Sequence, residues 1–299
     1  MRAAVRALSF APRPAARQLA SQRTNTIGLL LTEISGAFFS SMLRGIEAGV
    51  RAAGFALLIY ATKLEIPCEM ARHPLGEQNT DGLLVFPGSI SQAELARLAS
   101  IGFPVVLLHQ KPPPDTAFPF VTVENKSGSE MLVNHLIDAH GKRRIIFLCG
   151  PEGHEDSLWR ERGYFAALKA HQIPYDPGLV AYGGFDEKDA QDMIQHMVLD
   201  GVDFDAVFAG DDDAAIGVIA ALRLCGRSVP QDVAVVGFDD VPFARFLSPP
   251  LTTIRAPIER VGQEAVRLLV KRIQGQECEP EILLPTQLVI RQSCGCPPH

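Results

Sequence analysis

Cysteine is scarce in this sequence, with six residues in a chain of 299, and that scarcity excludes a fold held together by disulfides. Cys294 and Cys296 lie close together, on either side of one glycine, and the other four are far apart. No second pair of cysteines or histidines accompanies them at the spacing of a zinc finger, so we expect no metal site. Unpaired thiols in a reducing compartment, the cytoplasm, are the predicted state.

Long apolar runs are also missing. No run approaches the ~18 residues needed to cross a bilayer, and the N-terminus lacks the apolar stretch of a secretory signal. Acidic residues are absent from the first 26 positions, which hold five of the 28 basic residues. The rest of the chain therefore contains 23 basic residues and all 34 acidic residues. A basic arm on an acidic body suggests that the arm alone contacts a polyanion. An organellar transit peptide is an alternative interpretation of the same composition.

Signatures of catalysis are missing as well. The sequence has no nucleophile elbow, no glycine-rich phosphate loop, no H-E-x-x-H and no dinucleotide fingerprint. These absences favour a binding protein over an enzyme, and we expect neither catalytic activity nor a cofactor. A pair of carboxylates could still serve a hydrolase as acid and base, which keeps an enzyme open as an alternative.

The sequence does contain short apolar runs that alternate with amphipathic segments, and 47% of its residues are hydrophobic. This pattern is typical of parallel sheets covered by helices. In the first half we predict strands at 27–31, 55–60, 82–86, 104–108 and 120–123, with helices at 38–50 and 92–101. The pattern then restarts, with strands at 144–149, 179–182, 206–209, 233–238 and 287–290 and helices at 131–140, 158–171, 187–199, 214–225 and 258–274. Two such halves predict an α/β fold of two doubly wound parallel-sheet domains with a cleft between them.

Polar side chains follow several of these strands. Asp211, Asp239 and Gln110 each come one or two residues after a predicted strand. Phe38 follows the first strand, and Arg160 lies in the first turn of the helix after 144–149. Ligands of open parallel sheets bind beyond the carboxyl ends of the strands, and carboxylates, an arginine and an aromatic ring suit a polyhydroxylated ligand. Helix capping remains the alternative for one of the aspartates at 211–213, and a plain surface charge for Arg160.

Ten motifs follow one another along nearly the whole chain, at positions 5–12, 16–19, 23–24, 27–30, 81–82, 210–217, 229–233, 236–240, 250–254 and 291–293. In this order they resemble the motifs of the lactose-repressor/galactose-repressor family of bacterial transcription regulators. The resemblance implies a periplasmic-binding-protein-like core that forms a homodimer and clamps a small effector, a sugar or a related metabolite. Closure of the cleft would change the affinity of the regulator for operator DNA.

The resemblance also implies an assignment of domains and site residues. Residues 26–124 with 256–284 would form the first domain, 125–255 with 285–299 the second, and 1–25 a remnant of the DNA-binding headpiece and hinge helix. In that hinge, Arg17 and Leu19 would enter the minor groove, with Leu19 as the wedge between base steps. The effector pocket would be formed by Phe38, Gln110, Glu124, Arg160, Phe185, Asp211 and Asp239.

The chain departs from the family pattern at its start. Family members begin with a helix-turn-helix that reads the major groove, whereas Met1 falls inside what corresponds to the last part of that headpiece. A truncated chain and a misassigned start are both open interpretations, and DNA binding by this chain alone is expected to be weak and unselective. A solute-binding protein of a sugar transporter has the same fold and is the main alternative function, although it would need a secretion signal or lipid anchor.

Overall fold

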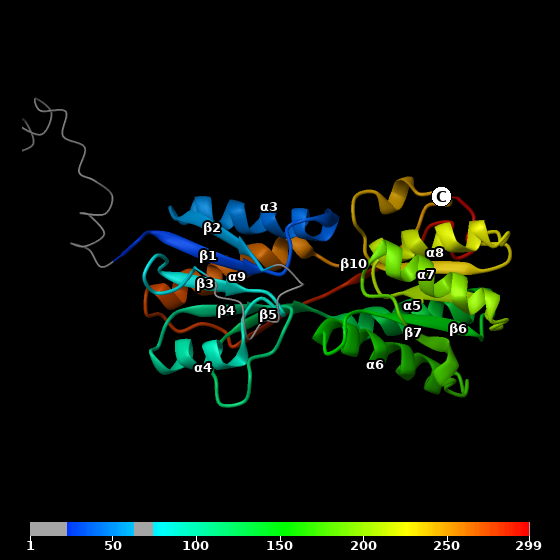
Figure 1. Ribbon diagram of the computed structural model, residues 1–299, viewed down its shortest axis with the longest axis horizontal. Helices are drawn as coiled ribbons and strands as arrows, with labels where there is room; N and C mark the ends of the chain where they lie inside the picture. The colour runs from blue at the N-terminus through cyan, green and yellow to red at the C-terminus, as the bar shows by residue number, and fades with distance from the viewer. Residues whose placement is uncertain (1–22, 63–73, 299) are drawn as a thin grey trace, which may run out of the picture.

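The computed structural model describes residues 23–62 and 74–298, which form two lobes lying side by side along the long axis of the molecule (Figure 1). Each lobe contains one six-stranded sheet with helices on both faces. The predicted fold class, two doubly wound parallel-sheet domains, is confirmed. Within the described ranges, no helix is long and apolar enough to cross a membrane.

The sheet of the first lobe is parallel throughout and has the strand order β11-β5-β4-β3-β1-β2. Its strands are β1 (Thr26–Leu31), β2 (Ala56–Ala61), β3 (Gly82–Val85), β4 (Val105–Leu108), β5 (Phe120–Val123) and β11 (Glu281–Leu284). Helices α3 (Gly36–Ala52) and α9 (Ile258–Ile273) cover one face, and α4 (Gln92–Ser100) covers the other. The central strands are fully buried, as expected of parallel strands covered on both faces.

The sheet of the second lobe has the order β12-β10-β9-β8-β6-β7 and is parallel except for β12, which runs antiparallel to β10. Its strands are β6 (Ile145–Cys149), β7 (Val180–Tyr182), β8 (Ala206–Ala209), β9 (Ala234–Asp239), β10 (Thr252–Arg255) and β12 (Gln287–Val289). Helices α5 (Asn125–His140) and α6 (Glu155–Ala170) pack on one face, and α7 (Glu187–Leu199) and α8 (Asp212–Leu224) on the other. The 3₁₀ turns η1 (Pro177–Leu179) and η2 (Ala244–Phe246) lie in loops.

Glycines set the distance between the two helices that cover one face of the first lobe. A Cβ added at Gly45 of α3 would lie 1.9 Å from the carbonyl oxygen of Glu259, and one at Gly262 of α9 would lie 2.7 Å from that of Met42. Met42 and Ile46 point from α3 into the core at helical spacing and are fully buried. The two helices therefore pack closely against each other, and α3 packs against the core of the first lobe.

The chain crosses between the lobes three times, at the connections β5–α5, β10–α9 and β11–β12 (Figure 1). The predicted start of the second helix group at 131 is wrong, because α5 begins at Asn125, directly at the first crossover. Its first turns contain Gly128, and glycine is a weak helix former. A Cβ at Gly128 would lie 2.8 Å from Oγ1 of Thr286, a residue of the third crossover. Glycine is therefore needed there because the third crossover approaches the helix closely.

Two further predictions about elements are corrected. Helix α6 begins at Glu155, so Arg160 lies in its second turn and not in the first. Strands β10 and β11 have no counterpart among the predicted strands. They complete the two sheets at the crossovers, where the sequence alone shows only short runs.

Candidate ligand-binding site

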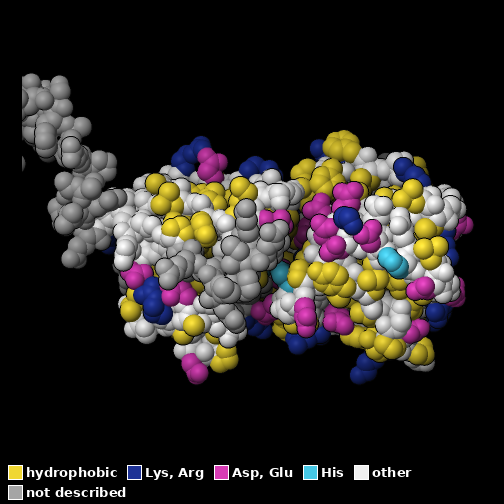
Figure 2. All heavy atoms as spheres, in the orientation of Figure 1, with side chains coloured by type: hydrophobic (Ala, Val, Ile, Leu, Met, Phe, Trp, Pro, Cys, Tyr) yellow, Lys and Arg dark blue, Asp and Glu magenta, His cyan; other side chains and the backbone are white. Residues whose placement is uncertain are grey.

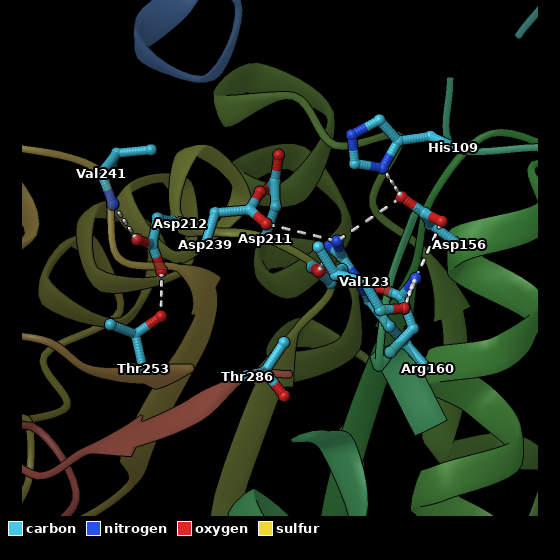
Figure 3. A network of polar contacts seen from close by, with 12 residues as sticks. His109, Val123, Asp156, Arg160, Asp211, Asp212, Asp239, Val241, Thr253 and Thr286 are labelled. Atoms are coloured by element: carbon cyan, nitrogen blue, oxygen red, sulfur yellow. Dashed lines mark hydrogen bonds and ion pairs between the residues drawn. The ribbon is translucent and has the colours of Figure 1, made fainter. Parts of the chain in front are cut away.

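Arg160 stands at the centre of a buried polar network where the lobes meet (Figure 3). Only 2% of the residue is exposed. Its Nε donates to Asn125 Oδ1 at 2.9 Å, Nη1 to the carbonyl oxygen of Gly210 at 2.6 Å, and Nη2 to Asp239 Oδ1 at 3.3 Å. The guanidinium also lies 3.8 Å from the ring centroid of Phe238. Contacts on every nitrogen fix the orientation of the planar group, which is the geometry that arginine provides and lysine cannot.

Asp156, one helical turn before Arg160, connects the two lobes. Its Oδ2 lies 2.7 Å from Nδ1 of His109, which follows β4 of the first lobe. Its Oδ1 accepts hydrogen bonds from Asn125 Nδ2 at 2.8 Å and from Thr122 Oγ1 at 3.2 Å. Burial favours the neutral acid, but the attraction of His109 and Arg160 outweighs it and holds the pKa of Asp156 well below its usual range. Asp156 is therefore an ionised carboxylate that links the halves of the molecule.

Two more carboxylates, those of Asp239 and Asp211, lie on the second-lobe side of the network. Asp211 is the N-cap of α8, where its Oδ1 accepts a hydrogen bond from the Ala214 N–H at 2.8 Å, so the capping alternative applies to this residue. Burial and the neighbouring charge of Asp239 raise the pKa of Asp211 to about 8. A protonated Asp211 can donate as well as accept a hydrogen bond. Asp212, by contrast, is bonded to Thr253 and a backbone N–H and has a structural role.

Aromatic rings surround the network on both sides of the junction. The ring centroid of Phe38, in the first turn of α3, lies 5.4 Å from that of His109 and 6.0 Å from that of Phe86. From the second lobe, the ring of Phe185 lies 5.3 Å from the guanidinium of Arg160. Charged groups bordered by aromatic faces suit a ligand with hydroxyl groups at its edges and an apolar ring face.

Two imidazole nitrogens beside the network, His109 Nε2 and His154 Nδ1, have no hydrogen-bond partner among the described residues. The ring centroid of His154 lies 5.3 Å from that of Phe185 and 6.3 Å from that of Phe86. Burial lowers the pKa of His154 to about 4, so the ring is neutral and offers one donor and one acceptor. Buried polar atoms without partners are rare in folded proteins, and these two, one from each lobe, indicate a place for a polar ligand.

Three of the seven non-glycine residues with a positive φ among the described residues belong to this site. His109, Phe185 and Asp239 have φ angles of 53°, 58° and 105°, in the region that favours glycine. Each such conformation costs on the order of 1–3 kcal/mol, and persists where the surroundings hold it, commonly at functional sites. The strain therefore occurs at three residues that belong to the network or to the aromatic rings beside it.

A cavity lies beside the network and not at its centre. It has a volume of about 580 Å³ and is lined by α3, the loop after β9 and the crossovers between the lobes. Phe38 and Asp239 belong to both the cavity and the network, whereas Arg160 and Asp211 are enclosed where the lobes meet. We take the network as the site because the charged groups and the partnerless nitrogens converge there.

The structure brings together five of the seven residues expected to bind the effector and leaves two apart. Gln110 Nε2 faces the carbonyl oxygen of Val85 at 3.4 Å, and Glu124 accepts from Ser127 Oγ at 3.2 Å; no described contact joins either to Arg160. Arg17 and Leu19, expected to contact the minor groove, lie outside the described residues. The five that do converge are Phe38, Arg160, Phe185, Asp211 and Asp239.

Sequence reasoning missed four residues of the network, which are His109, Asn125, His154 and Asp156. His109 directly follows β4 and Asn125 directly follows Glu124, so each is a neighbour of a residue that was singled out. Asp156 lies four residues before Arg160, on the same face of α6, a spacing that could have identified it.

Asp211 is expected to make the protein less stable as the pH rises. The folded state keeps its proton up to about pH 8, whereas a free carboxyl releases it near pKa 3.8. Its stabilising contribution is thus complete at low pH and is lost between about pH 4 and about pH 8. Asp211→Asn, which keeps the cap, should reduce this slope and raise the free energy of unfolding at about pH 8 by on the order of a few kcal/mol. Urea denaturation at several pH values measures this; an unchanged slope in the variant would contradict it.

Two sheet-containing lobes, three crossovers and a charged network enclosed between them define the class of this protein as periplasmic-binding-protein-like. In agreement, residues 133–294 match the periplasmic binding protein-like domain family. The transcriptional regulator CelR of Thermobifida fusca is 32% identical over 298 residues, 97% of this chain and 87% of CelR. The ribose operon repressor of Escherichia coli K12 is 30% identical over 292 residues, 97% of this chain and 88% of the repressor.

A solved structure agrees with these relatives. The complex of CelR with cellobiose has 30% sequence identity and a TM-score of 0.81, and the match covers 98% of this chain and 89% of CelR. The chain therefore belongs to the LacI family of transcription regulators, and the resemblance found in the sequence is confirmed.

Proposed function

We propose that this regulator senses a sugar or a related small metabolite, bound between the lobes at the network around Arg160. One observation carries the proposal: a buried guanidinium with carboxylates beside it lies next to two partnerless imidazole nitrogens, one from each lobe. Such groups exchange hydrogen bonds with vicinal hydroxyls. The relatives support this ligand class, since CelR has been solved with cellobiose and another relative is a ribose operon repressor.

In this proposal, the carboxylates bind the effector and do not catalyse its hydrolysis. Asp239 is paired with Arg160, Asp156 is held by His109 and Asn125, and Asp211 keeps its proton up to about pH 8, so a hydrolase would have no free carboxylate base here. Phe38 and Phe185 would cover the faces of the ligand. We assign residues 26–124 with 256–284 to the first domain and 125–255 with 285–299 to the second.

Effector binding would act by shifting the population of open and closed arrangements of the lobes. A ligand that contacts His109 and Arg160 together favours closure about the three crossovers. The chain that enters β1 follows the first lobe, because the N–H groups of Thr24 and Asn25 donate to the carboxylate of Asp81 at 2.6 and 2.8 Å. Closure in a dimer would thus change the spacing of the two basic N-terminal segments.

The charge of the lobes supports DNA contact through the N-terminal segment. Figure 2 shows acidic side chains gathered on the second lobe beside the junction, where the start of α7 exposes Asp186, Glu187 and Asp189. This face repels a phosphate backbone. The basic residues of the first 26 positions remain the part of the chain suited to DNA.

A thermal-shift screen tests the proposal directly. The full chain is heated with mono- and disaccharides, sugar phosphates, nucleosides and purines, and a ligand at about 100 times its Kd should add about 2.7 kcal/mol of stability. We expect a sugar to raise the Tm of the wild type, and Phe38→Ala to weaken that shift without unfolding the protein. A shift caused only by a purine, or a sugar shift unchanged in Phe38→Ala, would contradict the assigned ligand class or site.

We also infer that the regulator acts as a homodimer through the face formed by β2 and α3. Leu58 and Ile59 on β2, the edge strand of the first sheet, are 43% and 44% exposed. Apolar side chains on an open sheet edge favour association. Ile59→Asp should therefore convert the dimer to monomer in sedimentation equilibrium, whereas Ile101→Asp, at a position after α4 that is 52% exposed, should not. A dimer that survives Ile59→Asp would place the interface elsewhere.

A further inference from the structure

A second cluster of reactive side chains lies outside the cleft, at the C-terminal end of α5. His135 and His140 of α5 and Cys294 and Cys296 of the C-terminal segment place one possible ligand atom each within 4.8 Å of one another. His135 Nε2 lies 3.4 Å from Cys294 Sγ and 3.7 Å from Cys296 Sγ, and His140 Nε2 lies 3.4 Å from Cys296 Sγ. Both imidazoles thus direct Nε2 toward the sulfurs.

These distances agree with the edges of a tetrahedral zinc site. Zn–S bonds of about 2.3 Å and Zn–N bonds of about 2.0 Å at a tetrahedral angle place sulfur and nitrogen about 3.5 Å apart. Two thiolates and two imidazoles are a donor set of structural zinc sites, and four protein ligands leave no open position for substrate. A hard cation such as Mg²⁺ prefers oxygen ligands and does not suit these donors.

The fold holds the two cysteines in this position through contacts of their neighbours. Gly295 has a φ of +110°, and a Cβ there would lie 3.2 Å from Nδ1 of His140, so only glycine lets the segment approach the ring this closely. Ser293 Oγ accepts a hydrogen bond from the N–H of Thr252 at 2.8 Å. Thr252 Oγ1 donates to Cys294 Sγ at 3.1 Å, a contact of the kind that orients and stabilises a metal-bound thiolate.

We propose that His135, His140, Cys294 and Cys296 bind one Zn²⁺ in a closed structural site that fastens the C-terminal segment to α5. This proposal departs from the sequence analysis, which expected no metal site because it found no second pair close to the cysteines. His135 and His140 do have a zinc-like spacing of four intervening residues, but His135 precedes Cys294 by 159 residues.

The proposed zinc site and the effector site lie at opposite ends of α5. That helix runs from Asn125, which contacts Arg160, to His140, and its length of about 22 Å at 1.5 Å per residue separates the two. Removing the metal should therefore loosen the C-terminal segment without removing any group that contacts the effector.

The test uses the full chain, purified under reducing conditions without a histidine tag. We expect one Zn²⁺ per chain by elemental analysis, and loss of that metal in the double variant His140→Gln/Cys296→Ser. The matched control is His196→Gln/Cys225→Ser, which changes the same residue types elsewhere in the second lobe and should keep the metal. Circular dichroism and effector-dependent thermal shift show whether each variant is folded. Should the double variant not fold, the single variant His140→Gln is expected to lose the bound zinc in the same way.

Cobalt substitution reports on the geometry of the site and on the thiolate ligands. Co²⁺ in the wild type should give the visible absorption of a tetrahedral site and a near-ultraviolet thiolate charge-transfer band, which Cys296→Ser should reduce by about half. Four outcomes overturn the proposal: no Zn²⁺ bound by the reduced chain, equal binding in the double variant, a six-coordinate cobalt spectrum, or a Cys294–Cys296 disulfide that persists in reductant and excludes metal.

Discussion

Arg160→Met is expected to lower the free energy of unfolding by about 3–5 kcal/mol, because it removes one partner of a buried ion pair. Methionine fills much of the same volume, so the loss would come from the polar groups left behind. Those groups are the carboxylate of Asp239, the side-chain oxygen of Asn125 and the carbonyl oxygen of Gly210. Urea denaturation followed by circular dichroism measures the change.

The matched control is Arg162→Met, on the same helix. Arg162 is exposed and lies with its guanidinium 4.3 Å from the ring centroid of Trp159, so its replacement should change the free energy of unfolding by less than about 1 kcal/mol. Arg160→Lys keeps the charge but not the planar fork, and should recover only part of the loss. If Arg160→Met were as stable as Arg162→Met, the network would not be a stabilising element of the closed arrangement.

Asp156→Ala is expected to weaken effector binding at least about tenfold and to lower the free energy of unfolding by about 2–4 kcal/mol. The carboxylate of Asp156 joins the lobes through His109 and also accepts from Asn125. Without it, the closed arrangement loses a contact that the open one does not make, so the population shifts away from the form that binds the effector. Calorimetric titration with the sugar found in the screen measures the affinity.

A double-mutant cycle separates this link from a general loss of stability. His109→Ala and Asp156→Ala share one interaction, so their combined effect on effector affinity should fall short of the sum by at least about 1 kcal/mol. Asp192→Ala, which removes an exposed carboxylate paired with Lys188, is the control and should leave affinity unchanged. Fully additive effects of the two cleft substitutions would show that the contact between His109 and Asp156 does not govern closure.

The sheets could be predicted from the sequence because their strands are continuous apolar runs. The predicted strand 120–123 is β5 and 206–209 is β8, residue for residue, and the predicted helix 187–199 is α7. The start of α5 could not be predicted, since Asn125, Ser127 and Gly128 are weak helix formers and tertiary contacts at Gly128 decide the conformation. Strand β11 was missed although Ile282, Leu283 and Leu284 are apolar, because a run of three apolar residues is too short to show a strand pattern.

The site was found in part because one physical rule applies to it. Side chains that follow parallel strands gather at one edge of the sheet, and this identified Asp211 and Asp239. The rule does not state which way each side chain turns. Gln110 was chosen over His109 one residue earlier, but a φ of 53° at His109 directs that ring into the junction.

By itself the sequence determined the fold class and the family, because periodicity, composition and motif order are properties of neighbouring residues. Only the tertiary structure decided which distant side chains meet. His109 and Asp156 come together because the chain crosses between the lobes at β5–α5. His135 and Cys294 come together because the last segment returns along β10 to the end of α5. The strand order and crossovers that create such contacts depend on the packing of the whole chain, and no local pattern of residues records them.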